Sequence, residues 1–153
     1  MLVKEAPVSR ALLAKKVFAC WGITRPGAAM KKTFDLALER SGAKTTASGE
    51  TEFVWLSDQD PETYDKCRVI SPEGERRDAA DIPPEELAQG IKLIMSRQIA
   101  MQREDLLREA AHLFGFTRVT PALETSLALG IRQAKGKGYV SFGDDGKVSY
   151  NEN

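Results

Sequence analysis

The sequence has 153 residues, of which 42% are hydrophobic and 29% are charged, and its formal net charge at pH 7 is zero. This composition is typical of a folded, soluble protein and excludes a disordered one. No apolar run approaches the ~18 residues that a membrane span needs, and Met1 to Glu5 is too short and too quickly charged for a secretory signal. We therefore expect a cytoplasmic protein without a membrane partner.

Residue types that hold metals or act as nucleophiles are scarce. Two cysteines, Cys20 and Cys67, and one histidine, His112, are too few for a disulfide scaffold or a zinc site. No nucleophile elbow, phosphate-binding glycine loop or metalloprotease helix is present. We expect no metal, no cofactor and no enzymatic activity. The alternative is a small enzyme that uses His112 in a cleft beside Glu109 or Asp105.

A tandem repeat organises the chain. The segment Cys20 to Arg25 (CWGITR) occurs again as Leu113 to Arg118 (LFGFTR), and the two copies align at an offset of 93 residues without a gap. A spacing this wide is too long for a solenoid unit and suits two consecutive small domains of one fold.

In both copies an aromatic residue stands directly before a glycine. This pair predicts a helix that ends on a buried aromatic residue, with the glycine in a left-handed conformation just beyond the helix end. A short turn into the next helix then completes a helix-turn-helix. Cys20 occupies the position of Leu113, so we expect it to be a small buried hydrophobe as well.

The first copy begins partway through its first helix. Residues 1–5 align with the end of a helix in the second copy, so we expect the chain to be cut from a longer protein. An extended piece at 6–8 precedes a second helix, which Ser9 caps and which runs to about Trp21.

A third helix and a hairpin follow. Pro26-Gly27 introduces a helix that runs to about Arg40, and residues 43–56, with a turn at Ser48-Gly49-Glu50, predict a two-stranded hairpin. Helix, short strand, helix, helix and hairpin is the element order of a winged helix.

Residues 57–83 break the pattern. Prolines, glycine and acidic residues indicate an irregular connection, while apolar side chains are numerous enough for part of it to pack down. These apolar residues are Tyr64, Cys67, Val69 and Ile70.

The second copy is complete. Pro83-Pro84-Glu85-Glu86 predicts a helix start, because proline suits the first turn and acids suit the positive end of the helix dipole. A second helix at about 103–114 and a third that starts at Thr120-Pro121 follow. Two alternating strands flank the turn at 143–146 and predict the closing hairpin.

The sequence therefore predicts a mostly helical α+β fold with two winged-helix modules in tandem, residues 1–56 and 84–153. An acidic, partly ordered linker at 57–83 joins them. Residues 1–56 hold nine basic and five acidic residues (+4), residues 57–83 hold four and eight (−4), and residues 84–153 hold nine of each. The first module is the basic one.

Six cations without a single acid lie between Val8 and Phe34. In a helix-turn-helix, the third helix and the turn before it face the nucleic acid, where cations neutralise phosphates and release counterions. We predict contacts with nucleic acid, chiefly duplex DNA, by this set: Arg10, Lys15, Lys16, Arg25, Lys31 and Lys32. An ordinary solvated helix face is the alternative.

The equivalent surface of the second copy is less basic. It offers Arg118 and Arg132 as candidate contacts, but Glu124 stands where Lys31 stands in the first copy. An acid at the groove face repels phosphate, so this copy is a candidate for packing or for a protein contact.

Two motifs, together with Trp21 to Arg25, resemble an uncharacterised bacterial family. These motifs are Ile82 to Ala88 (IPPEELA) and Arg103 to Arg118 (REDLLREAAHLFGFTR). The family occurs at the C-terminal end of very large superfamily 1 helicase-like proteins that also carry a Vsr-like endonuclease domain. The resemblance implies an accessory region that handles DNA beside the motor and nuclease domains.

The sequence thus predicts a non-catalytic nucleic-acid-binding region whose partners are duplex DNA and the remainder of a helicase-like parent protein. The alternative function is a protein-interaction module that docks onto motor or nuclease domains, or that forms a homodimer.

Overall fold

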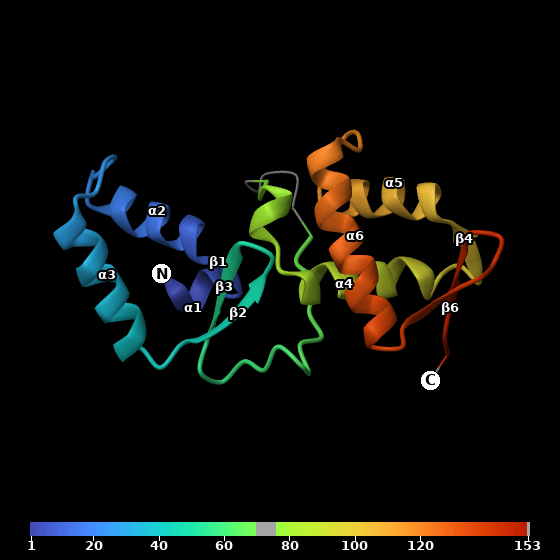
Figure 1. Cartoon of the computed structure of the whole chain (residues 1–153), viewed down its shortest axis with the longest axis horizontal. Coiled ribbons are helices and arrows are strands. Elements are labelled where there is room, and N and C mark those ends of the chain that lie inside the picture. The colour runs from blue at the N-terminus through green and yellow to red at the C-terminus, as the bar shows by residue number, and fades with distance from the viewer. Residues whose placement is uncertain (70–75, 153) are drawn as a thin grey trace. The chain divides into compact units, whose positions relative to one another are not determined.

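The computed structural model describes residues 1–69 and 76–152 (Figure 1). The fold is α+β, as predicted, and the described residues form six α-helices and two three-stranded antiparallel sheets. The chain divides into two compact units, Met1–Thr63 and Tyr64–Asn153. This division falls inside the segment that the sequence assigns to a linker, of which Ile70 lies outside the described residues.

Unit 1 contains three helices and one sheet. Its elements are α1 (Leu2–Glu5), β1 (Val8–Ser9), α2 (Arg10–Cys20), α3 (Ala28–Arg40), β2 (Lys44–Ser48) and β3 (Thr51–Trp55). The strand order is β1-β3-β2, with Val8 opposite Val54. The Ser9 hydroxyl accepts a hydrogen bond from the Leu12 backbone N–H at 3.1 Å, which caps α2 as predicted.

Unit 2 repeats this order of elements. They are the 3-10 helix η1 (Ala79–Asp81), α4 (Pro84–Met95), β4 (Ala100–Gln102), α5 (Arg103–Leu113), α6 (Pro121–Gly136), β5 (Val140–Phe142) and β6 (Lys147–Tyr150). The strand order β4-β6-β5 matches that of unit 1, and Met101 opposite Val148 matches Val8 opposite Val54. No helix within 1–69 and 76–152 combines the length and apolar character needed to cross a membrane.

The repeated glycine ends the second helix of each unit in the same way. Gly22 has φ 70° and Gly115 has φ 86°, a left-handed conformation that glycine adopts without a steric penalty. The next residue closes the turn: the Ile23 N–H donates to the Phe18 carbonyl at 3.0 Å, and the Phe116 N–H donates to the Ala111 carbonyl at 2.8 Å. The predicted left-handed glycine beyond each helix is confirmed.

The two aromatic residues before these glycines differ in burial. Phe114 is 1% exposed, whereas Trp21 is 67% exposed, so the prediction of a buried aromatic residue is wrong for unit 1. In unit 2 the ring of Phe114 packs against α4, where a Cβ added to Gly90 would lie 2.7 Å from the ring. In unit 1, α1 has four residues and aligns with residues 95–98, at the C-terminal end of α4, so within residues 1–63 no helix covers Trp21.

The predicted burial of Cys20 is also wrong. Cys20 is exposed, although its counterpart Leu113 is partly buried and packs against the core of unit 2. The reason is the same, because the short α1 leaves this end of α2 in solvent. The core of unit 1 is correspondingly small and consists of Val8, Leu13, Leu38 and Val54 with partly buried neighbours such as Phe34.

The core of unit 2 forms where α4 lies across α6, as Figure 1 shows. A Cβ added to Gly130 would lie 2.5 Å from the Cβ of Leu87, so the two helix backbones approach closely at this point. Leu127 and Ile91 are both 0% exposed beside this crossing. The third helix therefore packs on the first, and both pack on α5.

Part of the predicted linker belongs to unit 2. Tyr64 and Ile82 are buried, and the half-buried Cys67 packs against the unit 2 core. Burial, followed by the charge of Glu86, raises the pKa of the Cys67 thiol to about 11, so this thiol stays protonated at neutral pH. The Gln89 side chain donates a hydrogen bond to the Tyr64 carbonyl at 2.8 Å.

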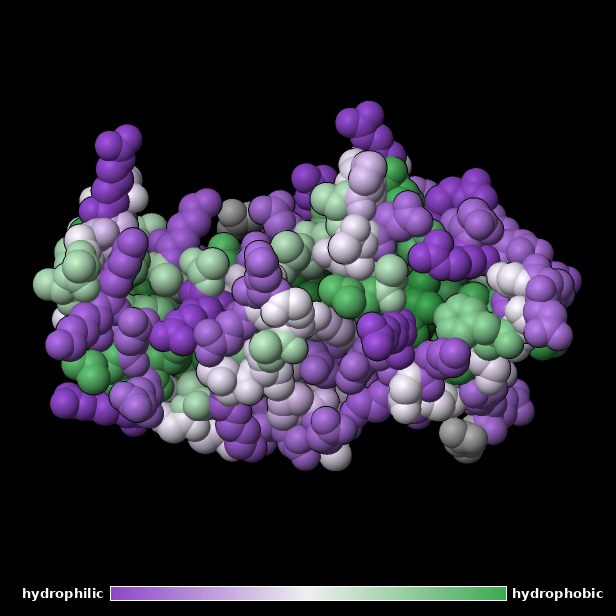
Figure 2. Space-filling model, viewed as in Figure 1, coloured by the Kyte–Doolittle hydropathy of each residue, from purple (hydrophilic) through white to green (hydrophobic). Residues whose placement is uncertain are grey.

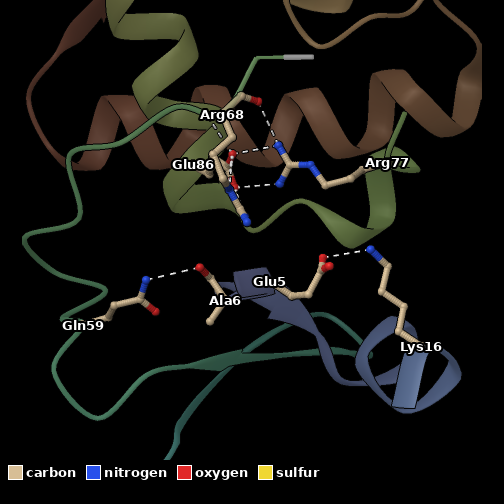
Figure 3. A network of polar contacts seen from close by, with 7 residues as sticks. All are labelled: Glu5, Ala6, Lys16, Gln59, Arg68, Arg77 and Glu86. Carbon is tan, nitrogen blue, oxygen red and sulfur yellow. Dashed lines mark hydrogen bonds and ion pairs between the residues drawn. The ribbon is translucent and has the colours of Figure 1, made fainter. Parts of the chain in front are cut away.

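A buried ion-pair network fixes the same segment to α4 (Figure 3). The Glu86 side chain is 0% exposed and accepts hydrogen bonds from Arg68 at 2.6 Å and from Arg77 at 2.7 Å. Burial alone disfavours the carboxylate, but the hydrogen bonds and charges of Arg77 and Arg68 outweigh this effect and lower the pKa of Glu86 below its ordinary value. The sequence interpretation of Glu86 as a helix-dipole residue missed this role.

We predict that Gly130→Ala destabilises unit 2 by about 1–3 kcal/mol, because the added methyl group overpacks the α4–α6 crossing. The matched control is Gly136→Ala at the end of the same helix, where nothing lies within 4 Å of the added Cβ. Thermal unfolding followed by circular dichroism measures both. Equal melting temperatures for the two variants would contradict the close approach.

We predict that Glu86→Gln lowers the stability of unit 2 by about 3 kcal/mol at pH 7, because it removes one partner of a buried ion pair. The folded-state pKa of Glu86 lies below its unfolded value of about 4.5, so its contribution is present above that pH and is lost as pH falls through the folded pKa. The wild-type protein should lose stability from about pH 4.5 downward more steeply than the variant.

Glu104→Gln, an exposed acid in the first turn of α5, is the control for that experiment and should shift stability by less than ~0.5 kcal/mol. Both tryptophans, Trp21 and Trp55, lie in unit 1, so circular dichroism reports both units while tryptophan emission reports unit 1. A loss seen equally in tryptophan emission would contradict a local role of Glu86 in unit 2.

Candidate nucleic-acid interface

The inner face of α3 fixes which of its side chains reach solvent. Leu38 is buried, Met30 and Phe34 are partly buried, and the Phe34 ring lies 5.8 Å from that of Phe18 on α2. These inner positions recur every fourth residue, so the opposite face of the helix is left to solvent. Lys32 is exposed on that face, and Lys31 is exposed at its border.

The N-terminal end of α3 has an electropositive character. Gly27 caps the helix without a side-chain hydrogen bond, and the first turn contains no acidic residue. The unpaired backbone N–H groups and the helix dipole add partial positive charge at this end. Arg25 in the preceding turn and Lys31 and Lys32 in the helix add full charges, and all three are exposed.

Arg10, the first residue of α2, is held by two acids of unit 1. It pairs with Asp35 on α3 at 2.6 Å and with Glu52 on β3 at 3.1 Å. The hydrogen bond to Asp35 outweighs the opposing effect of burial and, with Glu52, raises the pKa of the guanidinium. Arg10 therefore links the start of α2 to the third helix and the sheet.

Lys16 is also engaged, because it pairs with Glu5 of α1 at 2.8 Å (Figure 3). The structure thus divides the six predicted cations of unit 1 into two groups. Arg10 and Lys16 make ion pairs. The other four are exposed and take part in no ion pair among the described residues: Lys15, Arg25, Lys31 and Lys32.

The corresponding end of α6 in unit 2 carries an acid. Glu124 aligns with Lys31 and lies 3.4 Å from Arg103, the counterpart of Arg10. The Thr120 hydroxyl caps this helix by accepting from the Leu123 N–H at 3.2 Å. The candidate cations Arg118 and Arg132 lie before this helix start and near the far end of α6, and both are exposed.

The hairpin turns of both units carry acidic residues. Gly49 and Glu50 form the turn between β2 and β3, and Glu50 is exposed. Asp144 and Asp145 lie in the turn between β5 and β6 and are exposed as well. Carboxylates at these tips repel phosphate, so the hairpin turns are poor contacts for a nucleic-acid backbone.

His112 lines an open hollow in unit 2 together with Asp105, Arg108 and Glu109. This places the histidine beside the acids that an enzymatic role requires. Among the described residues, however, no hydrogen bond or ion pair involves the imidazole, whereas Asp105 pairs with Arg108.

The role of Glu86 was missed by sequence reasoning because its partners are distant in the chain. The available signal was the pair Arg76-Arg77 together with Arg68 in a segment otherwise rich in acids. Of these three, Arg68 and Arg77 pair with Glu86, whereas Arg76 lies over the Phe116 ring.

No family model matches this chain, and neither a curated protein nor a solved structure matches it.

Proposed function

We propose that unit 1 is a winged-helix module that binds duplex DNA through the start of α3 and the turn before it, without catalysis. The observation that carries this proposal is the group of exposed cations Arg25, Lys31 and Lys32, which flank an uncapped helix end that has no acid in its first turn. Helix ends of this kind favour anions, and cations beside them neutralise phosphates.

The element order and strand order of each unit support the winged-helix assignment. In such a fold the third helix enters the groove or lies against the backbone. The hairpin of unit 1 is not part of the proposed contact surface, because its turn carries the exposed acid Glu50. Arg10 and Lys16 are not part of it either, because they pair with acids inside the unit.

The proposed contacts are to phosphates, so they position DNA without reading its sequence. We therefore propose weak, salt-dependent and largely sequence-independent binding. This suits an accessory region that keeps DNA beside the motor and nuclease domains of a helicase-like parent protein, as the family resemblance implies.

Unit 2 has a different proposed role. The Glu124–Arg103 pair occupies the position that is cationic in unit 1, and residues 84–153 have no net charge. We propose that unit 2 contacts protein, either the remainder of the parent protein or a second copy of the chain. The two units would then divide DNA contact and protein contact between them.

The test is fluorescence anisotropy of a labelled ~20-base-pair duplex with the full chain at several salt concentrations. Three phosphate contacts predict a slope of log K against log salt of about −3. The double variant Lys31→Glu with Lys32→Glu should remove most binding and reduce the slope by about 2. The matched control reverses Arg132 and Lys135 on α6 and should retain binding.

Equal losses from the two double variants would overturn the assignment to unit 1. If the wild-type chain showed no binding even at low salt, DNA binding itself would be rejected, and the protein-contact function would remain.

A reciprocal substitution tests the same idea by gain of function. Glu124→Lys with Thr125→Lys gives unit 2 the cations of unit 1 at the start of α6. We predict a several-fold increase in DNA affinity and a salt slope that is steeper by about 1–2. Unchanged affinity would show that the start of the third helix is not the surface that meets phosphate.

A further inference from the structure

Asp35 lies on α3 within one helical turn of both lysines of the proposed DNA contact. It follows Lys31 by four residues and Lys32 by three, the two spacings at which helical side chains are neighbours. All three side chains are exposed, and Figure 2 shows hydrophilic residues projecting from the surface over α3 and the turn before it. A free carboxylate at this position would offset the lysine charges and repel phosphate.

The carboxylate of Asp35 is instead held by Arg10. Nη2 of Arg10 donates to an oxygen of Asp35 at 2.6 Å, while Nη1 donates to the two oxygens of Glu52 on β3 at 3.2 and 3.1 Å. Among the described residues, neither Lys31 nor Lys32 pairs with Asp35. The arginine of α2 therefore holds the acid that lies closest in sequence to the two lysines on its C-terminal side.

A guanidinium suits this arrangement for two reasons. Its N–H groups point in fixed directions within one plane, so it can hold an acid of α3 and an acid of β3 at the same time. It also stays charged throughout the physiological pH range, so it does not release Asp35 by losing a proton.

Unit 2 shows the other way to hold the third helix. Arg103 pairs with Glu124 at 3.4 Å, and Ala128 stands at the position that corresponds to Asp35. The acid that holds α6 therefore lies at the position of Lys31 and cancels positive charge there. In unit 1 the holding acid lies four residues later, which leaves the helix start cationic only if that acid is kept from the lysines.

We propose that Arg10 is a positioning residue for DNA binding, which holds Asp35 away from Lys31 and Lys32 and so keeps both lysines available to phosphate. Arg10 does this without touching the DNA itself. The inference rests on the proposed DNA contact at the start of α3. It assigns to an ion pair inside unit 1 an effect on the charge that the ligand meets.

The test is a double-mutant cycle on the full chain, with affinity for a labelled DNA duplex measured by fluorescence anisotropy at several salt concentrations. Arg10→Gln should weaken binding about fivefold and make the salt slope less steep by about 1, because Asp35 then occupies one of the lysines. Adding Asp35→Asn to this variant removes the acid and should restore affinity to within about twofold of the wild-type value.

Two single variants serve as controls. Asp35→Asn alone should change affinity by less than about twofold, because Arg10 already holds the acid and the asparagine oxygen still accepts from the guanidinium. Lys16→Gln also removes one positive charge from an ion pair, but its partner Glu5 lies on α1. It should change affinity by less than about twofold.

Circular dichroism checks that each variant is folded. If Arg10→Gln does not fold, the same cycle is run with Arg10→Lys, whose single ammonium cannot hold two acids in the fixed geometry of a guanidinium. This variant should show a smaller loss of affinity, which Asp35→Asn again restores.

A loss that Asp35→Asn does not restore would overturn the proposal, because Arg10 would then act only through the fold. Equal affinities of the wild-type chain and the Arg10 variant would overturn it, and so would a fivefold gain from Asp35→Asn alone. Absence of binding by the wild-type chain would reject the proposed function itself. Wild-type binding without coupling between positions 10 and 35 would reject this inference alone.

Discussion

The packing of a first helix against the third helix and the aromatic end of the second is the interaction on which unit 2 depends. In unit 2 it is complete, and the glycines at 90 and 130 let α4 approach Phe114 and α6 closely. Burying large side chains such as Leu87 and Phe114 contributes roughly 1.5–3 kcal/mol each, so this crossing makes a substantial contribution to the stability of the unit. Glu86 of α4 also pairs with Arg68 and Arg77, which holds the chain before α4 against this helix.

In unit 1, α1 contributes only Leu2 to the core, and Trp21 stays exposed. The sheet, the small core around Leu13 and Val54, and the ion pairs of Arg10 and Lys16 take a larger share of the stabilisation. The Arg10 and Lys16 pairs are partly exposed, and solvent-exposed ion pairs contribute only about 0–1 kcal/mol each. The core cluster within residues 1–63 is smaller than that of unit 2, and Trp21 is the largest apolar side chain of unit 1 that lies in solvent.

Both units use the first arginine of the second helix to hold the third helix, but with acids from different turns. Arg10 pairs with Asp35 in the second turn of α3, whereas Arg103 pairs with Glu124 in the first turn of α6. This shift leaves the start of α3 to Lys31 and Lys32. In unit 1 the acid that pairs with the arginine lies away from the helix start, so the start of α3 stays cationic. In unit 2 the paired acid, Glu124, lies at the helix start itself.

The elements and their order could be predicted from the sequence because local signals specify them. Ser9 caps α2 and Thr120 caps α6. Gly22 and Gly115 adopt the left-handed conformation beyond α2 and α5, and alternating strands flank the turn at 143–146. These interactions join residues close in the chain, so a local residue pattern is enough to predict each of them. The repeat gives the same pattern twice.

Burial and ion pairing could not be predicted in the same way. The exposure of Trp21 and Cys20 depends on a helix that unit 2 has and unit 1 has only as a single turn, so an alignment between the copies gives the wrong answer. The partners of Arg10 and Glu86 are set by the tertiary fold, up to 42 residues away in the case of Glu52. Which predicted cations are left for a ligand therefore emerges only from the structure.

The most direct test of the account is a titration of the ¹⁵N-labelled full chain with a ~20-base-pair duplex, followed by amide chemical shifts. The account predicts saturable, salt-sensitive shifts concentrated at Arg25 and the start of α3, with little change at the start of α6 or at Glu50. Shifts centred on α6 or on the hairpin turns, with α3 unaffected, would contradict it.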